Sequence, residues 1–185
     1  MNKLAIALTA ALSLGAAASA SAADGTITFT GKIVAATCKV EIGDGGGSTA
    51  TVALPDVTVG AVDGPDAGKR TFKIKLSADT GSGAACDKDT AKLYVYKSTV
   101  NANGHLANQY TDAVDDPASD VALKLSRIES GTETEINLQT AELEATKASG
   151  EFEYEFATRY QATAAAGATK AGGFTSQLMF DVENY

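Results

Sequence analysis

Apolar and charged residues alternate one by one along much of this chain. Phe72, Ile74 and Leu76 alternate with Lys73 and Lys75. In a β-strand, a period of two places the apolar side chains on one face and the charged side chains on the other. The segment is therefore predicted to be a strand with one buried face.

The same pattern recurs along the chain, between turns that are rich in Gly, Asp, Asn and Ser. About eight short strands separated by such turns are typical of a β-sandwich, so we expect an all-β fold. No internal repeat or long linker marks a second domain. The strands are expected at residues 25–40, 51–54, 72–76, 93–96, 121–128, 135–138, 152–160 and 174–182.

One segment has the composition of a helix. Residues 140–148 contain Glu, Leu, Ala and Lys, all of which have good helix propensity. A helix of one or two turns is predicted there.

The first 22 residues have the pattern of a signal peptide. Lys3 precedes an uncharged apolar run of residues 4–18, and Ala20 and Ala22 are the small residues that a signal peptidase reads. The run is too short for a comfortable membrane span. We therefore expect residues 1–22 to be removed on export, which leaves 163 of the 185 residues.

The exported chain is acidic. Without Lys3, 14 basic residues remain beside 23 acidic ones, a net charge of −9. This charge argues against nucleic acid or an anionic membrane surface as a partner.

Two cysteines, Cys38 and Cys86, lie in the exported part. In an oxidising compartment a pair of cysteines indicates one structural disulfide. The alternatives are two free thiols or half of a metal site. The second alternative lacks ligands, because His105 is the only histidine of the chain.

No catalytic apparatus is visible in the sequence. The run Gly45-Gly46-Gly47 lacks the Lys and Ser/Thr of a phosphate-binding loop and is interpreted as a flexible loop. His105 lies in a predicted loop without a neighbouring nucleophile, and is interpreted as a solvated side chain. We therefore expect no enzyme activity, no cofactor and no metal, with an exported hydrolase as the least favoured alternative.

Three stretches of the chain resemble a known family. They are DGTITFTGKIVAATC (residues 24–38), VALPDVTVGAV followed by AGKRTFKIKLS (52–62 and 67–77), and FATRYQAT followed by AGGFTSQLMFDV (156–163 and 171–182). Their order and spacing are similar to those of type 1-like fimbrial major subunits, the pilins of the chaperone–usher pathway. The resemblance covers about half of the exported chain.

The resemblance implies an incomplete immunoglobulin-like β-sandwich that lacks its final strand. The missing strand leaves an apolar groove, which a donor strand from a neighbouring subunit or from a chaperone completes. It also implies a division into a signal peptide (1–22), a donor-strand extension (23–36) and a pilin domain (37–185).

The site residues expected from the resemblance form two sets. The donor strand would present alternate residues of the N-terminal extension, namely Ile27, Phe29, Gly31 and Ile33. Alternation by itself fits an ordinary first strand of the same domain equally well. The acceptor groove, which would also contact the chaperone, would involve Phe174, Leu178, Phe180, Val182 and Tyr185.

Two features depart from the family pattern. Residues 78–85 separate the strand FKIKLS from Cys86, although the family usually places its second cysteine directly after that strand. Near the C-terminus, Asn184 stands where the family tends to have a Tyr, and Tyr185 follows it.

The expected function is that of a structural subunit of a cell-surface fimbria that supports adhesion and polymerises by donor-strand exchange. Its partners would be other copies of itself, a periplasmic chaperone and an outer-membrane usher, and any host receptor is unknown. A minor or adaptor pilin and a soluble secreted carbohydrate-binding β-sandwich are the alternatives.

Overall fold

The structure is a computed structural model that describes residues 38–43, 47–79, 81, 83–112, 115–165 and 167–185. All of them belong to one compact unit, Val34–Tyr185. The expected signal peptide and donor-strand extension lie outside the described residues.

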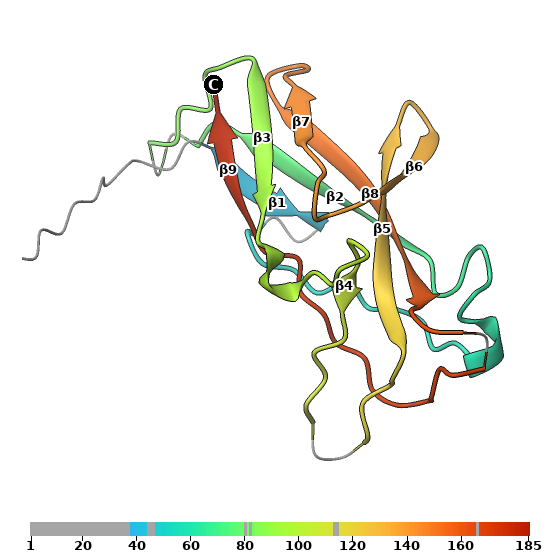
Figure 1. The fold of residues 1–185 in the computed structure, drawn as a ribbon. Coiled ribbons are helices and arrows are strands. Elements are labelled where there is room, and N and C mark those ends of the chain that lie inside the picture. The colour runs from blue at the N-terminus through green and yellow to red at the C-terminus, as the bar shows by residue number, and fades with distance from the viewer. Residues whose placement is uncertain (1–37, 44–46, 80, 82, 113–114, 166) are drawn as a thin grey trace, which may run out of the picture. The chain divides into compact units, whose positions relative to one another are not determined.

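The described strands form two antiparallel sheets (Figure 1). Two short 3₁₀ helices, η2 (Val59–Ala61) and η3 (Lys97–Thr99), lie in the connections. The smaller sheet has the order β7 (Leu143–Thr146), β3 (Thr90–Val95) and β9 (Phe180–Asn184). The larger sheet has the order β1 (Lys39–Ile42), β2 (Arg70–Ser77), β8 (Phe152–Ala162), β5 (Val121–Glu129) and β4 (Leu106–Ala107), and β6 (Thr132–Ile136) also pairs with β5.

The alternation in the sequence explains how the larger sheet buries one face. Strand β2 pairs with β8 so that Ile74 lies opposite Tyr154 and Leu76 opposite Phe152. These four side chains are completely buried. Lys73 lies on the other face, where its Nζ is 2.7 Å from Glu153 Oε1.

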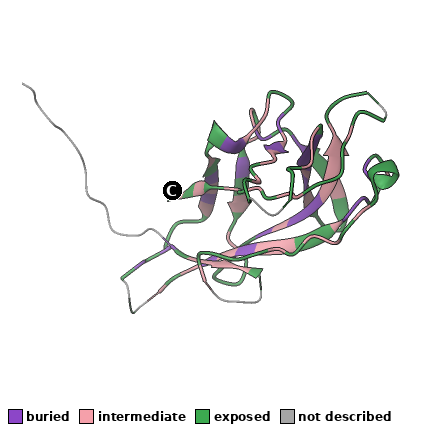
Figure 2. Ribbon diagram, turned by 90° about the horizontal axis from the view of Figure 1, so that it is seen from below, coloured by how far each residue is buried: buried purple, intermediate pink, exposed green. Residues whose placement is uncertain are grey.

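The core lies between the two sheets. Its members from the smaller sheet are Ala91 and Leu93 of β3 and Leu143 of β7, all in one cluster with the buried residues of β2, β5 and β8. Figure 2 marks the buried positions along the strands of both sheets. The expected all-β sandwich is confirmed.

Residues 140–148 do not form the helix that their composition predicts. Strand β7 occupies the segment, and its Leu143 lies opposite Leu93 of β3. Leu143 is buried, whereas Glu144 beside it is exposed. Pairing with β3 and burial of Leu143 outweigh a helix propensity that is worth only tenths of a kcal/mol per residue.

Two expected strands are shorter than predicted or not formed. Residues 51–54 belong to none of the described strands, and of residues 174–182 only the end from Phe180 is in a strand. The strand expected at residues 135–138 is β6, which ends at Ile136. Most of the strand expected at residues 25–40 lies outside the described residues, and β1 covers only Lys39–Ile42. No strand is predicted where β4 lies. Strands β2, β3, β5 and β8 match the predicted segments to within a few residues.

A tyrosine of the larger sheet is hydrogen-bonded to the smaller one. Tyr154 is completely buried, and its hydroxyl donates to the carbonyl oxygen of Ala91 at 2.7 Å. Burial raises the pKa of this phenol well above its ordinary value of 10. The tyrosine therefore joins the two layers in its protonated form.

We expect Tyr154→Phe to lower the free energy of unfolding by about 1–2 kcal/mol, because a buried carbonyl loses its donor. Below pH 10 the tyrosine is protonated in both states. Above pH 10 it ionises first in the unfolded state, so its contribution to stability falls as the pH rises. Urea unfolding at pH 7 and at pH 10–11 should show that the free energy of unfolding falls less with rising pH in the variant than in the parent.

Tyr96→Phe is the matched control, because Tyr96 is 48% exposed and contacts no second layer through its hydroxyl. Equal stability of the parent and Tyr154→Phe at pH 7 would contradict the expected role of this hydrogen bond.

Candidate functional site

A long groove of about 1490 Å³ opens along one side of the sandwich. Residues 48–54 with β1 form one wall, and residues 172–182 form the other. Partly buried apolar side chains that pack on the core make up much of its surface. They include Val40, Ile42, Leu54, Phe72, Phe174, Leu178, Phe180 and Val182.

The C-terminal wall is held from behind through the carbonyl groups of alternate residues. The carbonyls of residues 173, 175, 177 and 179 each accept a hydrogen bond from the chain behind the wall. The donors are Ala118 N (2.9 Å), Gln109 N (2.7 Å), Thr99 Oγ1 (2.9 Å) and Tyr96 N (2.9 Å), respectively.

These donors explain why the regular strand begins only at Phe180. Thr99 belongs to η3 and donates through its side chain, and Gln109 lies in a loop. An uninterrupted partner strand is needed for a regular ladder. The backbone groups of its odd-numbered residues nevertheless all point toward β3 and the loops behind the wall.

The opposite edge of this wall faces the groove. In an extended chain, the N–H and C=O groups of successive residues point to opposite sides. The backbone groups of the even-numbered wall residues therefore point toward the groove, namely those of Phe174, Ser176, Leu178 and Phe180. Strand β9 pairs with β3 on one edge, and none of the described strands pairs with its other edge.

The second wall is attached by very little hydrogen bonding. Among the described residues, no backbone–backbone hydrogen bond joins residues 48–57 to another segment. Arg70 Nε donates to the carbonyl oxygen of Ala53 at 3.2 Å. Residues 48–57 and the edge from Phe174 to Phe180 thus lie on opposite sides of an apolar groove, and both have backbone groups without a hydrogen-bond partner among the described residues.

Four of the residues expected to form the acceptor edge line this groove. They are Phe174, Leu178, Phe180 and Val182, all partly buried against the core. The ring of Phe174 meets the ring of Tyr160 edge-on, with centroids 5.2 Å apart. Their role in accepting a strand or a chaperone stays a prediction.

Tyr185 is placed differently. It follows the exposed positions Asp181 and Glu183 on the outward face, and its hydroxyl donates to Glu144 Oε1 of β7 at 2.8 Å. The groove is lined without it. A chaperone contact of Tyr185 would therefore have to involve the outer surface of the smaller sheet.

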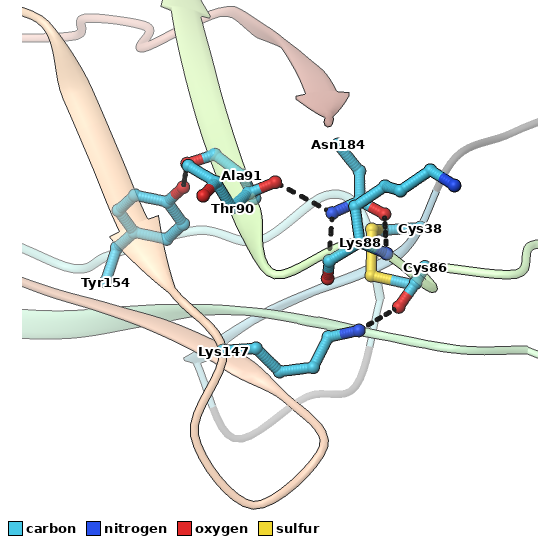
Figure 3. Close-up of a disulfide and its surroundings, with 8 residues drawn as sticks. All are labelled: Cys38, Cys86, Lys88, Thr90, Ala91, Lys147, Tyr154 and Asn184. Carbon is cyan, nitrogen blue, oxygen red and sulfur yellow. Dashed lines mark hydrogen bonds between the residues drawn. A yellow bond between two sulfur atoms is a disulfide. The ribbon is translucent and has the colours of Figure 1, made fainter.

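Asn184, the other departure from the family pattern, closes the end of the smaller sheet. Its Oδ1 accepts from Lys88 N at 3.1 Å, and its Nδ2 donates to the carbonyl oxygen of Thr90 at 2.8 Å (Figure 3). It thereby joins the last residues of β9 to the beginning of β3.

Cys38 and Cys86 form a disulfide, as the sequence predicts. Cys38 lies at the groove beside β1, and Lys147 Nζ donates to the carbonyl oxygen of Cys86 at 2.5 Å (Figure 3). Within the insertion, Asp79 N donates to the carbonyl oxygen of Ala84 at 2.8 Å, which holds these two residues together. The insertion therefore does not prevent Cys86 from reaching Cys38.

The expected donor residues Ile27, Phe29, Gly31 and Ile33 lie outside the described residues. Their role stays a prediction.

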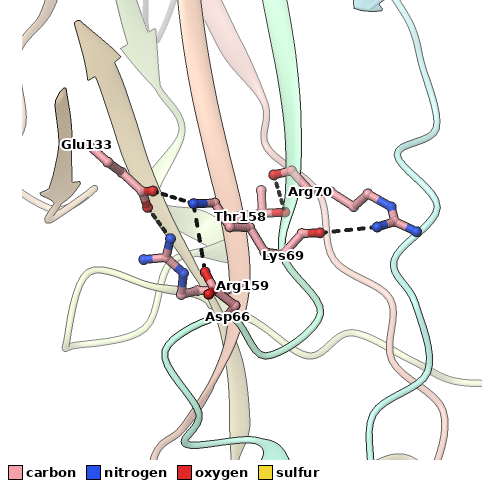
Figure 4. A network of polar contacts seen from close by, with 6 residues as sticks. All are labelled: Asp66, Lys69, Arg70, Glu133, Thr158 and Arg159. Carbon is pink, nitrogen blue, oxygen red and sulfur yellow. Dashed lines mark hydrogen bonds and ion pairs between the residues drawn. The ribbon is translucent and has the colours of Figure 1, made fainter. Parts of the chain in front are cut away.

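A charged network lies on the face opposite the groove. Glu133 Oε2 is 2.7 Å from Lys69 Nζ, and its other oxygen is bonded to Arg159 (Figure 4). The Lys69 ammonium, assisted by Arg159, holds the pKa of the Glu133 carboxyl below its ordinary value. Arg159 lies between Thr158 and Tyr160, which line the groove, so its side chain points away from it.

His105 is not the solvated loop residue that the sequence predicts. Its side chain is 12% exposed, and Nε2 lies 3.5 Å from Glu135 Oε1. This pairing with a surface carboxylate is no catalytic arrangement. Within the described ranges, no three His, Cys, Asp or Glu side chains are grouped to hold a metal, and no helix could span a membrane.

The second wall of the groove could not be predicted from the sequence. Residues 48–57 contain Val52, Leu54 and Val57, an apolar content that indicates a partly buried segment but does not reveal what it faces. The same holds for Asn108, whose side chain supports the other wall. No local pattern singles out one Asn in a loop.

Comparisons with known proteins agree with this architecture. The model of the fimbrial protein family matches residues 27–184. A chain of a chaperone–usher pilus, from a structure concerned with rod uncoiling, is similar with a TM-score of 0.52 and 18% identity over 87% of this chain and 95% of that one. The P pilus rod subunit PapA is similar with a TM-score of 0.52 and 16% identity over 81% of this chain and all of its own. No curated protein matches the chain.

We expect reduction of the Cys38–Cys86 disulfide to lower the free energy of unfolding by about 4 kcal/mol, because the bond closes a loop of about 50 residues in the unfolded chain. Urea unfolding of the oxidised and the reduced chain measures the difference. The double variant Cys38→Ala/Cys86→Ala is the control for the reductant. Coincident unfolding curves of the oxidised and reduced chains would contradict a stabilising disulfide.

Proposed function

The chain belongs to the fimbrial protein family, and from this we propose that it polymerises by lending its N-terminal segment to the groove of a neighbouring copy. Membership of the family makes it a structural pilus subunit rather than an enzyme. Within a fimbria it would be the major shaft subunit, and the filament would support adhesion.

The open edge of the C-terminal wall is the observation that carries the proposal. An edge with available N–H and C=O groups beside exposed apolar side chains pairs readily with another strand. Strand addition uses these two features together, because backbone hydrogen bonds supply pairing and alternate side chains fill pockets. The wall from Phe174 to Phe180 offers both, since its groove-facing backbone groups bond to none of the described residues and its apolar side chains are only partly buried.

The N-terminal segment has a suitable length and pattern. Residues 174–182 span about 30 Å when extended, and residues 25–33 would span the same length. Ile27, Phe29 and Ile33 would face the groove from alternate positions, and burial would contribute roughly 1.5–3 kcal/mol for each. Gly31 would lie where a side chain has no room.

The proposal includes a route to the cell surface. After export and removal of residues 1–22, a periplasmic chaperone would occupy the groove temporarily. An outer-membrane usher would then exchange the chaperone strand for residues 23–36 of the next subunit. The exposed edge of an isolated subunit would promote aggregation in water, and this supports a role for a chaperone that covers it.

We expect Phe29→Asp to abolish polymers, because a charged side chain would be forced into an apolar groove. Thr28→Asp is the matched control, since the same charge would then lie on the face that points away from the groove. Each full-length variant is expressed with its chaperone and usher. Surface fimbriae are then run unboiled in SDS, where polymers form ladders that collapse to monomer on heating.

The parent and Thr28→Asp should form ladders, and Phe29→Asp should give monomer only. Ladders of equal length from all three proteins would contradict strand donation. A chain that is exported and folded but always monomeric would instead indicate an independent binding module.

A further inference from the structure

One side chain joins the beginning of the C-terminal wall to the loops behind it. Asn108 follows β4, and its Nδ2 donates to the carbonyl oxygens of Ala118 and Gly173, each at 2.9 Å. Its Oδ1 accepts from the N–H groups of Tyr110 and Thr175, at 3.0 and 3.1 Å. These four bonds use both amide hydrogens and both lone pairs of the side chain.

The two wall residues that Asn108 binds are the neighbours of Phe174. Gly173 is fixed further by packing, because a Cβ atom added to it would lie 2.3 Å from the Tyr110 ring. Its N–H also donates to the carbonyl oxygen of Asp116 at 2.8 Å. The backbone of Phe174 is therefore held on both sides, and its ring is held against Tyr160 inside the groove.

The rest of the irregular wall is held less firmly. The carbonyl oxygens of Gln177 and Met179 accept from Thr99 Oγ1 and Tyr96 N, respectively. No described side chain bridges two wall residues there in the way that Asn108 bridges 173 and 175. Within the irregular wall, the end at Phe174 is thus the most tightly fixed part.

A fixed point has a specific use in a groove that accepts a strand. A slip of one residue turns every side chain of a strand to the other face and is strongly disfavoured. A slip of two residues keeps each side chain on its original face of the strand. Alternation alone therefore distinguishes this slipped pairing poorly from the correct one. A rigid residue at one end of the groove gives the incoming strand a reference position.

We propose that Asn108 is a positioning residue that sets the register of the incoming strand by fixing Phe174. It does not line the groove, so it acts through the wall residues that it binds. This inference rests on the proposed function, because it requires that the groove accepts a strand.

The test measures the affinity of labelled peptides for the full-length exported chain carrying Phe29→Asp, which leaves the groove residues unchanged. The peptides correspond to residues 24–37, 24–33 and 28–37, so each shorter peptide lacks four residues at one end. Asn108→Ala is compared with Asn101→Ala, because Asn101 also accepts two backbone N–H groups in a loop but lies outside the groove. Fluorescence anisotropy gives the dissociation constants.

Asn108→Ala should raise the dissociation constant of the longest peptide by about five- to tenfold, the equivalent of about one net hydrogen bond. It should weaken the binding of the shorter peptide that reaches Phe174 by the same factor, and it should leave the dissociation constant of the other shorter peptide unchanged. Asn101→Ala should change none of the three. Asn108→Asp keeps the two acceptor bonds and loses both donors, and it should reproduce the pattern if the Ala variant fails to fold.

Equal weakening of all three peptides would mean that Asn108 only stabilises the fold, and it would overturn the inference. Unchanged affinities in both Asn108 variants would also overturn it. If the peptides do not bind even with Asn108 intact, the proposed function itself fails, and the inference fails with it.

Discussion

The edge of the C-terminal wall from Phe174 to Phe180, which pairs with none of the described strands, lies beside an apolar groove, and the rest of this structure depends on it. Among the described strands, β9 has a partner on one side only. The side chains of Phe174, Leu178 and Phe180 line the groove beside it instead of being covered by another strand. An isolated domain with such an edge is both less stable and more prone to associate. A second strand is the simplest partner that satisfies the backbone groups and the apolar side chains together.

The hydrogen bonds that support this edge lie on the side of the wall away from the groove. Side chains of Asn108 and Thr99 bind the irregular wall, and Tyr154 joins the two sheets through the start of β3. The disulfide at Cys38 anchors β1 to the segment that leads into the same strand. One wall is therefore fixed by the chain itself, whereas residues 48–57 make few hydrogen bonds among the described residues.

The sequence predicts the fold well and the site only in part. Strict alternation, as in Phe72–Leu76, shows which residues are buried, because burial of one face is a local property of a strand. Residues 140–148 mislead because pairing with β3 decides their structure, and pairing is not local. The wall at residues 174–179 is irregular because η3 and loop side chains replace a partner strand. The placement of Tyr185 likewise depends on Glu144, which is distant in the sequence.

The central claim is that the groove is filled by a strand from another copy, and contacts between copies test it most directly. Filaments can be assembled from an equal mixture of ¹³C-labelled and ¹⁵N-labelled chains and studied by solid-state NMR. The account predicts cross-peaks between Phe29 of one isotope and Leu178 or Phe180 of the other. Cross-peaks that appear only in uniformly labelled chains, and vanish in the mixed filaments, would show that each chain fills its own groove and would contradict it.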